Sequence, residues 1–129
     1  MKTITSAELK ELLKSAGVEN PHLADENYSL MAAADLRKLN RLLSLVRLLP
    51  YKAQKRDCDD YAVTARAVCR LFFGNKAFGE IWANGISTTG AYHAANFYVD
   101  ETKTIKLYEP QNAKSTDFKP TGDHILTIV

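Results

Sequence analysis

The hydrophobic residues of this chain change their spacing at Gly74 and Asn75. Before this point, apolar residues recur every three or four positions, which predicts helices over 6–16 and 32–46 and a third helix that begins at Cys58. After it, runs rich in aromatic and β-branched residues predict strands at 78–83, 92–99, 104–109 and 124–129. This order predicts an α+β fold, with N-terminal helices packed on an antiparallel sheet of about four strands.

Length and composition favour one domain. The chain has 129 residues, of which 46% are hydrophobic, enough to bury one sizeable core. We expect a single domain over 1–129, in which 1–27 form an N-terminal helical extension and 28–129 form the core. No apolar run is as long as a membrane span and no signal peptide is evident, so the expected protein is soluble, makes no membrane contact and is cytoplasmic by default.

The start of the third predicted helix combines a thiol with acidic residues. Asp57 is a good N-cap, so Cys58 falls in the first turn, where unpaired N–H groups and the helix dipole favour a thiolate. Asp59 and Asp60 oppose this, because two negative charges beside a thiolate disfavour it. A bound cation or a neighbouring imidazolium would resolve the conflict.

The strands at 92–99 and 104–109 can be tested against each other as a hairpin. A three-residue loop at 100–102 places Phe97 opposite Ile105 and His93 opposite Glu109, all on one side of the sheet. A loop of even length would put His93 and Glu109 on opposite sides. The hydrophobic match favours the odd loop, and therefore predicts a His–Glu pair at the rim of the core.

These residues are the parts of a Cys–His–acid triad. In that interpretation, Cys58 is the nucleophile, His93 exchanges its proton, and Glu109 orients the imidazole. Taken singly, each residue has an ordinary structural explanation: a buried thiol, a core histidine, a charge at a strand end. The combination favours a reactive site, while the second cysteine, Cys69, is expected to lie in the core.

The motifs also resemble a known family. The run Asp57-Cys58-Asp59-Asp60-Tyr61-Ala62, then His93-Ala94-Ala95-Asn96 and Glu109-Pro110-Gln111-Asn112, resembles the papain-like, calcium-dependent cysteine protease domain of the Marasmius oreades agglutinin type. More distantly, their order is similar to that of the transglutaminase-like superfamily. The resemblance covers roughly residues 28–112.

The resemblance implies a papain- or transglutaminase-like fold and a calcium-dependent peptide or amide hydrolase acting on a peptide or protein substrate. It implies Cys58, His93 and Glu109 as the catalytic triad. It also implies Asp59, Asp60 and Gln111 as ligands of Ca²⁺, an ion that prefers oxygen ligands.

Two alternatives stay open. One is a transglutaminase-like transamidase or deamidase, which would use the same acyl-enzyme chemistry. The other is a non-catalytic protein- or nucleic-acid-binding module that uses the basic region 37–56. Nucleic acid is the weaker partner, because the net charge is only +2 and the basic residues of this region are not regularly interleaved with aromatic ones.

Overall fold

The computed structural model describes residues 2–49, 52, 57–86, 92–120 and 124–129. Three helices lie in these ranges: α1 (Ser6–Ser15), α2 (Ala33–Arg47) and α3 (Cys58–Phe73). The strands in these ranges are β1 (Thr3–Thr5), β2 (Asn27–Ser29), β3 (Phe78–Ala83), β4 (His93–Val99), β5 (Ile105–Glu109), β6 (Lys114–Asp117) and β7 (His124–Ile128). None of the described helices combines the length and apolar character that crossing a bilayer requires.

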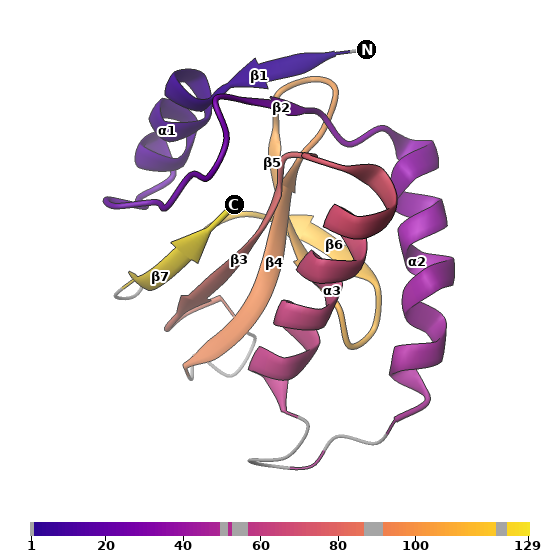
Figure 1. Cartoon of the computed structure of the whole chain (residues 1–129). Coiled ribbons are helices and arrows are strands. Elements are labelled where there is room, and N and C mark those ends of the chain that lie inside the picture. Colours follow the sequence, from indigo (N-terminus) through magenta and orange to yellow (C-terminus); the bar gives the residue numbers. More distant parts are fainter. Residues whose placement is uncertain (1, 50–51, 53–56, 87–91, 121–123) are drawn as a thin grey trace.

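The strands form two antiparallel sheets. β1 pairs with β2, and the larger sheet has the order β6-β5-β4-β3-β7. The expected fold of helices on a sheet of about four strands is therefore wrong in its architecture. The main sheet has five described strands, and the N-terminal part contributes a second sheet as well as a helix (Figure 1).

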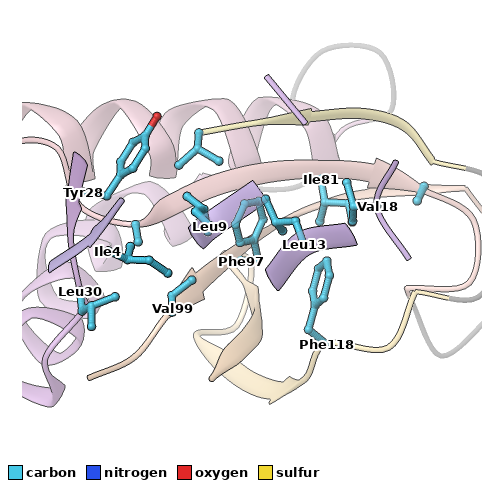
Figure 2. Packing of buried hydrophobic residues seen from close by; sticks show 13 residues of the cluster. Ile4, Leu9, Leu13, Val18, Tyr28, Leu30, Ile81, Phe97, Val99 and Phe118 are labelled. Carbon is cyan, nitrogen blue, oxygen red and sulfur yellow. The ribbon is translucent and has the colours of Figure 1, made fainter. Parts of the chain in front are cut away.

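Helices cover both faces of the main sheet because its central strands are apolar on both sides. On one face, Leu9 and Leu13 of α1 pack with Ile81, Phe97 and Val99, and Figure 2 shows this cluster with Phe118 at its border. On the other face, α2 and α3 pack against side chains that alternate with these along the strands. They are Phe78, Tyr98 and Tyr108.

The N-terminal segment is joined to the sheet by backbone hydrogen bonds. The Met31 N–H donates to the Val99 carbonyl at 2.9 Å, and the Ser29 N–H donates to the Asn75 carbonyl at 3.0 Å. The His22 N–H donates to the Thr127 carbonyl at 2.8 Å, and the Val129 N–H donates to the His22 carbonyl at 2.9 Å. Residues 2–31 therefore share both hydrogen bonds and core packing with the rest of the molecule.

The register of β4 against β5 differs from the predicted one by two residues. Phe97 pairs with Leu107, and Val99 pairs with Ile105. The connection is longer than expected because Asp100 Oδ1 accepts hydrogen bonds from Thr102 N at 2.9 Å and from Thr104 N at 3.0 Å. A shift of two residues leaves every side chain on its predicted face, so His93 and Glu109 still share one side of the sheet.

Candidate functional site: an acidic helix start beside a His–Glu pair

The start of α3 carries the thiol and the three aspartates. Asp57 precedes the helix in an extended conformation, and its N–H donates to Asp60 Oδ2 at 3.1 Å. Cys58 is therefore the first residue of the helix, as predicted, and its thiol is partly exposed. The backbone N–H groups and the dipole of the first turn favour negative charge at this position.

The three aspartates form one cluster. Each of Asp57, Asp59 and Asp60 offers a carboxylate oxygen, and these oxygens all lie within 4.8 Å of one another. The pKa of Asp59 is raised, first by its hydrogen bond with Asp57, then by burial and by the charges of Asp57 and Asp60. A raised pKa means that the neighbouring carboxylates and burial disfavour the charged form of Asp59. A bound cation would relieve this repulsion, and oxygen ligands of this kind suit Ca²⁺.

His93 and Glu109 meet as predicted. His93 Nε2 lies 2.6 Å from Glu109 Oε2, and the two side chains are 18% and 23% exposed. The other oxygen of the carboxylate, Oε1, accepts a hydrogen bond from the Gln111 N–H at 3.1 Å. Glu109 is therefore held at both oxygens, and among the residues that the structure describes the imidazole uses only Nε2 in this pair, which leaves Nδ1 for a different partner.

The thiol and the His–Glu pair lie at the same end of the molecule, where α3 and β4 both begin (Figure 1). Tyr92 directly precedes β4: burial raises the pKa of its hydroxyl, and the charges of Cys58 and Asp59 raise it further. Among the contacts of the described residues there is no hydrogen bond between the Cys58 thiol and the His93 imidazole. The structure thus brings together His93 with Glu109 and Cys58 with the aspartates.

Two residues of this region were not singled out from the sequence. Asp57 was interpreted only as a helix cap, although its carboxylate belongs to the acidic cluster. Tyr92 precedes β4 and carried no motif, so only the packing of α3 on β4 reveals it. For Gln111, the hydrogen bond found is that of its backbone N–H to Glu109, and its part in metal binding stays a prediction.

The remaining sequence expectations have mixed outcomes. Cys69 is buried in the core, as predicted, and burial raises the pKa of its thiol to about 12. In the basic region 37–56, Arg47 is used internally: its Nε donates to the Pro110 carbonyl at 2.9 Å and its Nη2 to the Tyr108 hydroxyl at 2.8 Å. Residues 50–51 and 53–56 of this region lie outside the described residues.

No protein-family model and no curated protein matches this chain. Solved structures do match. They include the "PSL1a-E64 complex" and the Polyporus squamosus lectin bound to the human-type influenza-binding epitope Neu5Aca2-6Galb1-4GlcNAc. Each has a TM-score of 0.81 and 18% sequence identity, over 98% of this chain. The alignments cover 50% and 49% of those chains, so this chain spans about half their length. At this identity, the likeness shows a shared fold.

This comparison contradicts the papain-like and transglutaminase-like assignment. The structures that share the fold are named as a lectin, and neither is named as a peptidase. It also contradicts what depended on that assignment: the cysteine-dependent peptide or amide hydrolase and its peptide or protein substrate. The transamidase, deamidase and basic-region binding alternatives gain no support from it either.

Proposed function

We propose that this chain is a calcium-binding module with a reactive thiol beside the bound ion. The observation that carries the proposal is the cluster of Asp57, Asp59 and Asp60 oxygens within 4.8 Å of one another, next to Cys58 in the first turn of α3. Three carboxylates in one turn repel one another, and a divalent cation offsets that repulsion. In this proposal Asp59 and Asp60 are ligands, as expected from the sequence, Asp57 is added to them, and Gln111 is a further candidate.

The cation and the His–Glu pair have complementary roles towards the thiol. Cation binding would neutralise the carboxylates that disfavour a Cys58 thiolate, so the helix start would then favour negative charge. His93, oriented by Glu109, would receive the thiol proton and stabilise the anion as an imidazolium. Cys58, His93 and Glu109 therefore act as one thiol–imidazole–carboxylate site in this proposal.

Calcium binding can be tested by calorimetric titration of the wild-type protein with Ca²⁺. Asp59→Asn and Asp60→Asn should weaken binding strongly, because each removes one charged ligand. Asp117→Asn is the matched control, since Asp117 is an exposed acid on β6, away from the cluster. Binding that is absent from the wild-type protein, or unchanged by the α3 variants, would contradict the proposal.

Thiol reactivity is tested by the rate at which iodoacetamide alkylates Cys58, with the adduct located by mass spectrometry. Alkylation should be faster with Ca²⁺ than with a chelator and slower in His93→Ala, because both conditions change how readily the thiolate forms. His22→Ala is the control, since His22 is exposed and its backbone pairs with Ile128 at the end of β7 rather than with α3 or β4. An alkylation rate that responds neither to Ca²⁺ nor to the His93 substitution would contradict the proposal of a reactive thiol.

A second candidate function is glycan binding, which the matched lectin structure favours. That structure contains a sialylated epitope, but this chain aligns with only 49% of it. The test is binding of the isolated chain to an array that includes Neu5Aca2-6Galb1-4GlcNAc. Repeating it with Asp59→Asn shows whether the binding of any glycan depends on the proposed cation site.

The cytoplasmic location expected from the sequence stays a prediction, which cell fractionation would test.

A further inference from the structure

Asn96, in the middle of β4, is fully buried, with 0% of its surface exposed. Its side-chain Nδ2 donates two hydrogen bonds, to the Ala62 carbonyl in α3 at 3.0 Å and to the Gly79 carbonyl in β3 at 3.1 Å. Both partners are acceptors, so only the NH₂ end of the amide can face them, which fixes the orientation of the side chain. One side chain therefore joins a helix and two strands.

The helix residue that Asn96 holds is close to the proposed site. Ala62 lies four residues after Cys58, about one helical turn, which is roughly 5–6 Å along the axis. Asn96 lies on the face of β4 that packs against α3, and Tyr92 directly precedes this strand. The charges of Cys58 and Asp59 contribute to the raised pKa of the Tyr92 hydroxyl, after the larger effect of burial.

Apolar packing alone would hold this helix weakly in register. The residues of α3 that face the sheet near Asn96 are Ala62 and Ala65, which are fully buried and small. Small side chains let the helix approach the sheet closely, but they interlock little with their neighbours. The two buried hydrogen bonds of Asn96 fix the position of α3 along the sheet, which the small alanines do not. Sliding the helix would leave the Asn96 donors unpaired.

We infer that Asn96 is a positioning residue, which sets the start of α3, with Cys58 and the aspartates, against the start of β4, with Tyr92 and His93. The inference rests on the proposed function, since the groups that Asn96 positions are those of the proposed thiol and cation site. Asn96 itself touches neither the thiol nor the aspartates in any contact found.

Terbium luminescence can measure this placement. Tb³⁺ binds to oxygen ligands as Ca²⁺ does, and it emits when an excited tyrosine nearby transfers energy to it. The part of the terbium emission that Tyr92 sensitises, from its place just before β4, is measured as the emission lost in Tyr92→Phe. The share from Tyr61 is an internal reference, because Tyr61 is on the same helix as the aspartates. The ratio of the two shares therefore reports the position of α3 relative to β4.

Two substitutions at Asn96 serve as the test. Asn96→Asp keeps the shape but replaces the donor NH₂ with an oxygen, and Asn96→Ser shortens the side chain so that it reaches neither carbonyl. Both should lose most of the Tyr92-dependent emission while they keep the Tyr61-dependent share, and both should lower the alkylation rate of Cys58. Tyr108→Phe is the matched control, because the buried Tyr108 hydroxyl bonds to Asn40 and Arg47 of α2 rather than to α3.

Each outcome decides the question. The inference is overturned if the Asn96 variants retain the Tyr92-dependent emission and the alkylation rate, or if Tyr108→Phe reproduces their losses. In the wild-type protein, which needs no variant to fold, adding the cation should shift the Nδ2–H resonances of Asn96, and an unchanged resonance would also overturn it. If the wild-type protein binds no terbium, the proposed cation site is contradicted instead. The alkylation rate of Cys58 in the Asn96 variants then tests the positioning role of Asn96 alone.

Discussion

Glu80 is a buried carboxylate on the face of β3 that α3 covers, with only 4% of its surface exposed. Burial raises its pKa, and the nearby charge of Arg66, whose Nη1 lies 3.6 Å from Glu80 Oε2, lowers it only in part. The folded protein therefore binds a proton at Glu80 more tightly than the unfolded chain does. The free energy of unfolding should fall as the pH rises from the ordinary value of 4.5 through the raised pKa.

Replacing Glu80 with glutamine should remove this pH dependence. Glu80→Gln buries a neutral group of similar shape, so its free energy of unfolding should equal or exceed that of the wild type at about pH 7 and differ less at about pH 4. Urea unfolding at both pH values checks this. Arg66→Gln is the opposite control, because it leaves the Glu80 charge uncompensated and should cost about 1 kcal/mol at neutral pH. A steeper pH dependence in Glu80→Gln would refute the assignment.

The two cysteines should differ in reactivity. Burial raises the pKa of Cys69 to about 12, so its thiol stays protonated and shielded in the folded protein. Iodoacetamide at about pH 8 should therefore label Cys58 and leave Cys69 unmodified until the protein is unfolded. Peptide mass mapping before and after denaturation measures this. Labelling of Cys69 in the folded protein would show that the core around it opens.

At the scale of elements, α2 is held at its start by Asp35. The Asp35 carboxylate accepts hydrogen bonds from the Ala32 N–H at 3.0 Å and from Lys76 Nζ at 2.8 Å, while Lys76 Nζ also donates to the Leu30 carbonyl at 3.2 Å. Burial alone would raise the pKa of Asp35, but these hydrogen bonds outweigh it and the pKa is lowered. The carboxylate therefore stabilises the fold above its ordinary value of 3.8, and this contribution is lost as the pH falls through the lowered pKa.

Asp35→Asn should accordingly destabilise the protein at neutral pH. It removes a partly buried charged hydrogen bond to Lys76, so we expect a loss of about 1–2 kcal/mol in the free energy of unfolding. The loss should shrink in acid, where the wild-type carboxylate is also protonated. Asp117→Asn is the comparison, since this exposed acid should change stability by less than about 0.5 kcal/mol. Equal effects of the two substitutions would show that burial of the Asp35–Lys76 pair has no consequence.

The elements that were predictable are those with strong periodic patterns. The start of α3 at Cys58 and the limits of β3 at 78–83 follow from the sequence, as does the shared face of His93 and Glu109. β6 was missed because the residues of Lys114–Asp117 are all polar and exposed, so the segment shows no alternation of apolar and polar residues. The register was misjudged because the Asp100 side chain organises a longer turn than the assumed three residues.

The candidate site was predictable only in part. Acids next to a cysteine at a helix start are visible in the sequence. So is whether a hairpin loop has an odd or an even number of residues, which decides the residues that share a face. The approach of Tyr92 to Cys58 and the hydrogen bonds of Asn96 are not, because they depend on how α3 packs across β4. The choice of family failed for a different reason: the order of a few motif residues does not fix the architecture around them.

At the scale of the whole molecule, the N-terminal segment completes one face of the sheet. Leu9 of α1 is fully buried against the β3–β4 face (Figure 2). Leu9→Ala should therefore cost about 2–5 kcal/mol in the free energy of unfolding, from lost burial and the cavity left behind. Leu45→Ala is the control, because 72% of the Leu45 surface is exposed and its truncation should change stability little. Chemical denaturation of both variants measures the difference, and similar values would mean that α1 docks loosely.

The outer edge of the main sheet has a consequence for the protein at high concentration. β6 is an edge strand, and its outward N–H and C=O groups could pair with a strand of another molecule. Its ends carry Lys114 and Asp117, both exposed, and an approaching identical strand would have to desolvate these charges. Concentrated solutions should therefore resist fibril formation along this edge, and neutral replacements at these two positions would weaken that resistance.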